Sequence, residues 1–214
     1  DLTVAMAVPR LLPMPPARIT GGRVLLDGED ILAMPPERLR AVRGARIGVI
    51  FQDPMGSLSP LHRIGDQLAE TARLHGAPRA AARDLARGWL GKVGLPESAA
   101  RAYSHELSGG MQQRVMIAMA LMLEPDLVVA DEPTTALDVT VQAQVLRLMR
   151  KLRRASSGVL LITHDLAVVS QLATRLAVMY AGQVVETADD AAAFFRAPRH
   201  PYSRALLRAI PSAA

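Results

Sequence analysis

The 214-residue sequence has no cysteine, only two lysines, few aromatic residues and no long hydrophobic run. Without cysteine, disulfide bonds and thiolate metal sites within this chain are excluded. Aromatic residues make up 3% of the chain. Few side chains are therefore available for the base stacking by which many proteins bind single-stranded nucleic acid. The longest apolar run, Val115 to Leu123, has nine residues, whereas a membrane-spanning helix needs about twenty. These absences argue against a disulfide scaffold, a protein that binds single-stranded nucleic acid and a membrane-spanning segment.

The remaining composition is that of a globular protein with a basic surface. Half of the residues are hydrophobic, 21% are charged and the net charge is +5, so a folded core is expected and disorder is not. The densest basic run, Arg147 to Arg154, also carries Leu148 and Leu152 at helical spacing. We therefore interpret this run as the solvated face of a helix in preference to a nucleic-acid patch.

The first half of the chain predicts short strands followed by helices. Residues 1–12 have helical composition and are followed by prolines that end a helix. A hairpin is predicted around Asp27-Gly28 and a short buried strand at Ala45–Phe51. From residue 54 to about residue 106, alanine and arginine dominate and β-branched residues become rare. This change predicts two or three helices, which we interpret as a helical subdomain inserted in an α/β core.

After residue 106 the sequence predicts alternating helices and strands. The expected elements are a helix from about Ser108, a strand at Leu127–Ala130, a helix from about Thr140, a strand at Val159–Thr163, a helix after Asp165 and a strand at Arg175–Tyr180. Such alternation predicts a mainly parallel sheet with helices on both faces. Sheets of this kind bind ligands at the carboxyl ends of their strands.

Polar residues follow three of these strands where that rule places a ligand. They are Gln52, the pair Asp131 and Glu132, and His164. A hydrophobic strand that ends in two carboxylates suits a magnesium nucleotide, because one carboxylate can bind the cation and the other can take a proton from water. The alternative is that Asp131 only caps the next turn, and the pair by itself supports both interpretations equally.

The sequence LSGGMQQR, from Leu107 to Arg114, predicts a second element of a phosphate site. Ser108 can cap a helix, while Gly109 and Gly110 allow a phosphate to approach the backbone. The amino terminus of a helix also presents unpaired N–H groups and a partial positive charge. The alternative is an ordinary flexible start of a helix. The methionines that follow are interpreted as helix packing.

Together these segments resemble the ATP-binding cassette family. LSGGMQQR is similar to the family signature, LVVADEP to its magnesium strand, TTALD (Thr134 to Asp138) to the loop that crosses to a partner, IFQDP to the glutamine loop and ITHD to the switch-histidine segment. The five motifs occur in the family's order over about residues 47–165. The resemblance implies an α/β fold, P-loop NTPase-like (RecA-like), with a mainly parallel sheet core and an inserted α-helical subdomain.

The resemblance also implies the role of each site residue. Glu132 would polarise the attacking water, and His164 would contact the γ-phosphate. Gln52 would sense the γ-phosphate and the transmembrane subunit, and it would serve the metal site. Asp131 would hold Mg²⁺ through water. The residues expected to bind ATP, partly that of an opposing subunit, are Ser108, Gly109, Gly110, Gln112 and Asp138.

The carboxyl-terminal segment narrows the resemblance to one group. RAPRHPYSRALLRAIP, from Arg196 to Pro211, is similar to the segment that follows the cassette in ATPases of oligopeptide and dipeptide importers. Locally, His200-Pro-Tyr202 is also a helix start with Pro201 in the first turn. The expected domains are an α/β core at 1–53 and 107–195, a helical subdomain at 54–106 and a carboxyl-terminal extension at 196–214.

This resemblance implies the cofactors, partners and location. ATP and Mg²⁺ are the expected cofactors. The expected partners are a second ATPase subunit in a homo- or heterodimer, transmembrane permease subunits and, indirectly, a peptide-binding receptor, with no nucleic acid. The place of action would be the cytoplasmic face of the inner membrane. The transported substrate stays open between peptides, nickel and glycosides.

One departure from the family pattern concerns the phosphate loop. The family motif G-x-x-x-x-G-K-[ST] needs a lysine, and neither Lys92 nor Lys151 has that context. We expect that the loop is missing through truncation and that this chain alone is inactive. A degenerate regulatory cassette is one alternative, against which the intact Glu132 and His164 argue. A non-transport cassette acting on DNA is another, but the long coiled coil or zinc-binding insertion that it predicts is not seen.

Overall fold

A computed structural model describes residues 2–134, 139–152 and 155–209. Residues 2–162 form one compact unit, and the described residues from Thr163 onward form a second. Within the described residues, no helix has the length and apolar character needed to cross a bilayer.

The first unit is built around a three-stranded parallel sheet. Its strands are β3 (Ile47–Ile50), β4 (Leu127–Asp131) and β5 (Gly158–Ile162), in the order β3-β4-β5. A separate hairpin is formed by β1 (Leu25–Leu26) and β2 (Glu29–Asp30). Asp27 and Gly28, at its turn, both have positive φ values of 49° and 83°, as the predicted hairpin requires. The predicted hairpin and the predicted parallel strands at Ala45–Phe51, Leu127–Ala130 and Val159–Thr163 are therefore confirmed.

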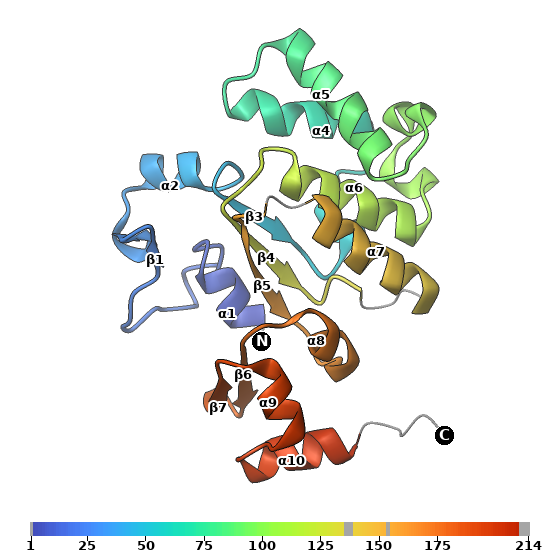
Figure 1. Cartoon of the computed structure of the whole chain (residues 1–214). Helices are drawn as coiled ribbons and strands as arrows, with labels where there is room; N and C mark the ends of the chain where they lie inside the picture. Colours follow the sequence, from blue (N-terminus) through green and yellow to red (C-terminus); the bar gives the residue numbers. More distant parts are fainter. Residues whose placement is uncertain (1, 135–138, 153–154, 210–214) are drawn as a thin grey trace. The chain divides into compact units, whose positions relative to one another are not determined.

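Helices cover both faces of this sheet. The helices of the unit are α1 (Leu2–Ala7), α2 (Pro36–Val42), α3 (Pro54–Ser57), α4 (Ile64–Leu74), α5 (Arg79–Lys92), α6 (Gly109–Leu121) and α7 (Val139–Leu152). Figure 1 shows α6 and α7 on one side of the sheet and α1 on the other. Alternate residues of β4 serve the two faces: Val128 and Ala130 join the cluster with α6, whereas Val129 joins the cluster with α1. This double burial explains why Leu127 to Ala130 of β4 are all hydrophobic.

Residues 54–106 are mainly helical, as the sequence predicts. Ile64, Leu68 and Ala72 recur at helical spacing on α4 and are almost completely buried, and they belong to the same core cluster as Trp89 and Leu90 of α5. Short 3-10 helices follow at Glu97–Arg101 (η2) and Ser104–Glu106 (η3), and another lies earlier at Ile31–Ala33 (η1). The domain boundaries drawn from the sequence stay predictions.

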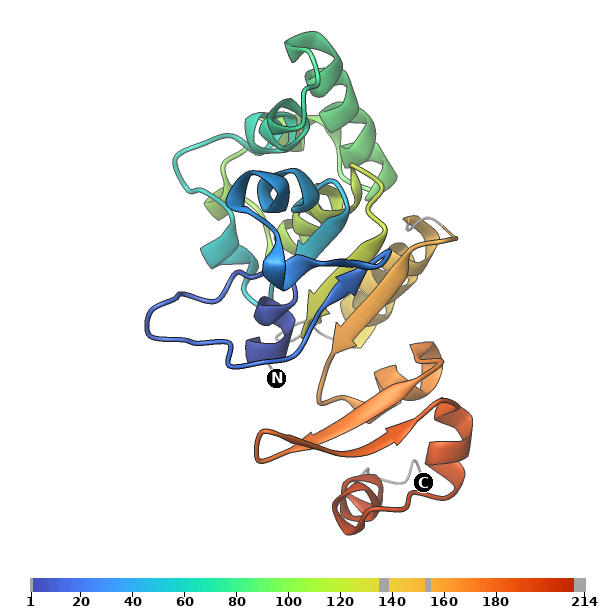
Figure 2. The same cartoon turned by 90° about the vertical axis from the view of Figure 1, so that its left-hand side faces the viewer.

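The described residues of the second unit form an antiparallel hairpin and three helices. Its elements are α8 (Leu166–Leu172), β6 (Leu176–Tyr180), β7 (Gln183–Ala188), α9 (Ala191–Arg196) and α10 (Pro201–Arg208), seen together in orange and red in Figure 2. The predicted strand at Arg175–Tyr180 is present as β6, but it was expected in a parallel sheet and in the described structure it pairs antiparallel with β7. The strand β7 was not predicted from the sequence. The turn between β6 and β7, Ala181-Gly182, has positive φ at both residues, which suits a two-residue hairpin.

The start of α10 is anchored on this hairpin. The Glu186 carboxylate accepts hydrogen bonds from the backbone N–H groups of Arg199, at 2.8 Å, and His200, at 2.9 Å. His200 Nδ1 accepts from the N–H of Tyr202 at 3.1 Å and so caps the helix. The Tyr202 ring lies 4.5 Å from that of Tyr180, measured between centroids. The predicted helix start with Pro201 in its first turn is confirmed.

Candidate functional site: the carboxyl edge of the parallel sheet

Strand register brings Gln52 and the two carboxylates to the same edge of the sheet. Ile50, the last residue of β3, pairs with Ala130 of β4, and Asp131 pairs with Ile162 at the end of β5. Because the three strands are parallel, their carboxyl ends meet at one edge. Gln52 lies just beyond β3, and Glu132 lies just beyond β4.

Glu132 occupies a sharp turn after β4. Its φ is +43°, a left-handed conformation that is uncommon for residues other than glycine. Pro133, which follows it, disfavours the right-handed helical conformation at this position. The Glu132 N–H donates to the carbonyl of Ile162 at 2.9 Å, and Gln52 Nε2 donates to Glu132 Oε2 at 2.9 Å. The glutamine and the carboxylate predicted from separate motifs are therefore in direct contact.

Asp131 is buried beneath this turn. Its residue is 2% exposed, and its Oδ2 atom has no hydrogen-bond partner. Burial raises the pKa of Asp131 above its ordinary value, and the negative charge of Glu132 adds to this increase. An unpartnered buried carboxylate oxygen is destabilising by itself, so a cation is the partner that its chemistry favours.

The donor set at this edge fits Mg²⁺ held mainly by a nucleotide and water. Within residues 2–134, 139–152 and 155–209, no three His, Cys, Asp or Glu side chains gather as a complete metal cage. Mg²⁺ commonly uses one or two protein carboxylates, substrate phosphates and several waters. The free Oδ2 of Asp131 suits that mode of binding, and the Gln52 side chain reaches the same edge through its bond to Glu132.

The LSGGMQQR segment forms the start of α6. Ser108 is the N-cap, and its hydroxyl accepts from the N–H of Met111 at 3.4 Å. A Cβ atom added at Gly109 would meet open space, whereas one added at Gly110 would lie 3.1 Å from Val141 of α7. Gln112 is 4% exposed, and its Nε2 donates to the carbonyls of Ser104 and Leu107. The roles of Ser108, Gly109, Gly110 and Gln112 toward a nucleotide stay predictions.

Gln113 joins α6 to the turn after β4 that contains Glu132 and Pro133, a contact that was not predicted from the sequence. Its Nε2 donates to the carbonyl of Pro133 at 2.6 Å, and the residue is 2% exposed. A signal was present in the sequence, because an amide on a helix that packs in the core must find a polar partner. The identity of that partner, a carbonyl 20 residues farther along the chain, is visible only in the fold.

Two of the predicted site residues, His164 and Asp138, lie outside the described residues of the first unit. His164 lies two residues beyond the end of β5 and belongs to the second unit, so its place in the site stays a prediction. Asp138 and the preceding residues from 135 lie outside the described residues.

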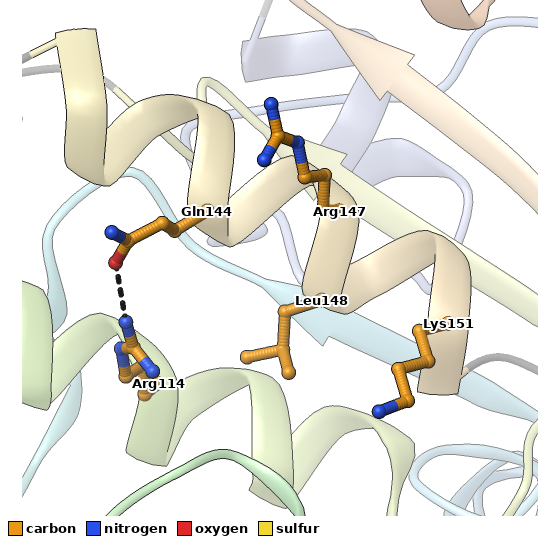
Figure 3. Close-up of a pocket in the computed structure, with 5 residues that line it drawn as sticks. All are labelled: Arg114, Gln144, Arg147, Leu148 and Lys151. Atoms are coloured by element: carbon orange, nitrogen blue, oxygen red, sulfur yellow. Dashed lines mark hydrogen bonds between the residues drawn. The ribbon is translucent and has the colours of Figure 1, made fainter.

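Both lysines of the chain have positions other than a phosphate loop. Lys92 Nζ lies 4.4 Å from the centroid of the Trp89 ring. Lys151 lines a shallow hollow of about 340 Å³ between α6 and α7, together with Arg114, Gln144, Arg147 and Leu148 (Figure 3). The hollow contains none of the predicted site residues, and Arg114 spans it by a 2.7 Å hydrogen bond to Gln144.

Comparison with solved structures defines the class of the fold. The chain is similar to the dimeric ATP-binding cassette MJ0796, with a TM-score of 0.74, 27% identity and coverage of 87% of this chain and 79% of that chain. A dimeric post-hydrolysis state of MJ0796 bound to ADP and Pi gives a TM-score of 0.75 with the same identity and coverage. The fold is therefore that of a P-loop NTPase-like α/β protein with a parallel sheet.

Comparison of sequences identifies the family. The family model described as "ABC transporter" matches residues 7–135, which is more than half of the chain. The probable peptide ABC transporter ATP-binding protein y4tR of Sinorhizobium fredii is 50% identical over 211 residues, which cover 97% of this chain and 63% of that protein. The dipeptide transport ATP-binding protein DppD of Escherichia coli is 48% identical, over 92% of this chain and 61% of DppD. The chain belongs to the ABC transporter family, and it spans somewhat less than two thirds of these relatives.

Proposed function

We propose that this chain is part of the ATP-hydrolysing subunit of an ABC importer for oligopeptides or dipeptides, which couples ATP hydrolysis to transport across the inner membrane. The observation that carries the proposal is the contact between Gln52 and Glu132 beside the unpartnered Oδ2 atom of Asp131. The names of the relatives, a probable peptide transporter subunit and a dipeptide transport subunit, support the substrate class.

Each residue at the edge has a distinct chemical role in this proposal. Glu132 takes a proton from the attacking water, and the hydrogen bond from Gln52 orients its carboxylate. Asp131 would hold Mg²⁺, which supplies positive charge to the phosphates when it is bound. Gln52 would respond to the same cation and to the γ-phosphate, which His164 would contact from beyond β5.

The amino-terminal turn of α6 would serve a nucleotide bound mainly by another subunit. Ser108, Gly109 and Gly110 form this turn, and backbone N–H groups at a helix start favour phosphate oxygens. Gln112 and Asp138 would support the same composite site. The implied partners are a second cassette subunit and transmembrane permease subunits, with a peptide receptor acting indirectly. The subunit would work at the cytoplasmic face of the inner membrane.

The phosphate loop is the component that this chain does not supply, since neither of its lysines lies in the required motif. The coding sequence upstream of Asp1 discriminates between two explanations. An in-frame G-x-x-x-x-G-K-S supports an ATPase whose first part lies outside these 214 residues. The absence of such a motif supports the degenerate regulatory cassette.

Replacement of Glu132 tests the proposed chemistry in the full gene product. Glu132→Gln removes the proton acceptor and leaves Asp131 in place, so ATP binding should persist while turnover falls by about 10²–10⁴-fold. Turnover is measured with a cassette partner whose own ATP site has been inactivated, and binding by calorimetry. Glu97→Gln is the matched control, because the Glu97 side chain is 80% exposed. Equal turnover in Glu132→Gln and the unmodified protein would refute the assignment.

A further inference from the structure

Gln113 is a buried amide that joins two functional segments. It lies in the second turn of α6, four residues after Gly109, and its Nε2 atom reaches the Pro133 carbonyl at 2.6 Å. Pro133 directly follows Glu132 in the chain. A single side chain therefore connects the helix that begins with Ser108-Gly109-Gly110 to the turn that carries the proposed proton acceptor.

The turn at Glu132 depends on its surroundings for its geometry. A left-handed φ of +43° at a residue other than glycine is retained only where neighbouring groups enforce it. Two such groups lie at the carboxyl edge of the sheet: the Ile162 carbonyl accepts a hydrogen bond from the Glu132 N–H, and the Gln52 amide donates one to the Glu132 carboxylate. Gln113 adds a third restraint from the helical layer.

The same helix is anchored beside Gln113. Arg114 donates to the Val93 carbonyl at 2.9 Å and to Gln144 Oε1 of α7 at 2.7 Å, and Figure 3 shows the second bond crossing from α6 to α7. A helix rises by about 1.5 Å per residue, so Gln113 lies only about 6 Å along the axis from Gly109. A displacement of the first turn of α6 would therefore act directly on the Pro133 carbonyl.

We propose that Gln113 is a positioning residue that holds Glu132 in its reactive orientation and couples that orientation to the amino-terminal turn of α6. The proposal rests on the function proposed above, in which this turn binds the nucleotide of the opposing subunit and Glu132 accepts a proton at its own site. Occupancy of one nucleotide site then changes the position of the carboxylate at the other through one hydrogen bond.

Two replacements at Gln113 and one control test this role in the full gene product. Gln113→Leu preserves much of the side-chain volume but cannot donate to Pro133. We expect kcat for ATP hydrolysis to fall about ten- to hundredfold, as for a small misplacement of a catalytic group, while KM for ATP stays within about twofold. The control is Gln67→Leu: Gln67 is also buried and donates to two carbonyls, those of Ser59 and His62. It should retain kcat.

Gln113→Glu gives a signature that general loosening would not produce. Only the protonated carboxyl group can donate to the Pro133 carbonyl, and burial favours the protonated form. The kcat of Gln113→Glu, divided by that of the unmodified protein at the same pH, should therefore rise as the pH falls from about 8 to about 6. Unchanged kcat in Gln113→Leu, an equal loss in Gln67→Leu, or a flat pH ratio in Gln113→Glu would overturn the proposal.

Amide hydrogen exchange separates this proposal from the proposed function. If the unmodified protein has no ATPase activity, the proposed function fails, but the restraint on Glu132 is still measurable. The Glu132 N–H, which is bonded to Ile162, should exchange at least about tenfold faster in Gln113→Leu than in Gln67→Leu and the unmodified protein. Equal exchange in all three proteins would refute the positioning role whatever the activity. If Gln113→Leu does not fold, the same comparison is made with Gln113→Glu above and below its pH transition.

Discussion

Replacement of Asp131 by asparagine should stabilise the nucleotide-free protein while it removes a group that the proposed function needs. Asp131 is 2% exposed, and its Oδ2 atom has no hydrogen-bond partner. An unsatisfied buried polar group costs about 1–3 kcal/mol. Asparagine keeps an unpaired polar atom but removes the charge, so a gain near the lower limit, about 1 kcal/mol, is expected. For a chain of this size that corresponds to a rise in Tm of about 2–4 °C.

The pH dependence of this gain follows from the raised pKa of Asp131. Below the ordinary value of 3.8 the carboxyl group is protonated in both the folded and the unfolded state, and it imposes no difference. As the pH rises through 3.8, the unfolded state ionises first and the folded protein loses stability until the raised pKa is passed. The advantage of Asp131→Asn should therefore increase from about pH 4 toward pH 7.

Urea unfolding without nucleotide or divalent cation, at several pH values, measures this advantage. Asp84→Asn is the control, because the Asp84 side chain is 76% exposed and lies 3.8 Å from Arg87. A change within about 0.5 kcal/mol is expected there. If Asp131→Asn is less stable than the unmodified protein at pH 7, or if its effect is the same at all pH values, the Asp131 carboxylate is not an uncompensated buried charge.

Two further predictions concern the fold. Gly48→Ala should destabilise the first unit by about 3 kcal/mol in urea unfolding, because its Cβ would lie 2.2 Å from the Ala120 carbonyl oxygen. At Gly88 a Cβ meets nothing within 4 Å, so Gly88→Ala should increase the free energy of unfolding by up to about 1 kcal/mol. Similar effects at the two sites would contradict the packing of β3 on α6. Glu186→Gln should accelerate exchange of the Arg199 and His200 amides. Burial raises the pKa of Glu186, but the hydrogen bonds that it accepts outweigh burial and lower it below 4.5, so unmodified protein should lose the same protection as the pH falls through that lowered pKa. Protection that persists below it would show that the carboxylate does not anchor α10.

Much of the fold and of the candidate site was predictable from local patterns in the sequence. The hydrophobic run Leu127–Ala130 of β4 and the positions of the polar residues after it depend on short-range chemistry, since strand ends and helix caps are encoded within a few residues. The pairing of Ile50 with Ala130 and of Asp131 with Ile162 then confirms a parallel sheet. The five motifs also identified the ABC family, because their residue types and order are specific when they occur together.

Only the tertiary structure decided which polar groups meet across long sequence separations. Gln52 and Glu132 are 80 positions apart in the sequence, and Gln113 and Pro133 are 20 positions apart, yet each pair forms a direct hydrogen bond. Likewise, the burial of Asp131 and the pairing of β6 with β7 across the two-residue turn at Ala181-Gly182 are visible only in the folded chain. Local sequence sets the conformational preference of each segment, but a hydrogen bond between distant residues depends on the register and packing of the whole unit.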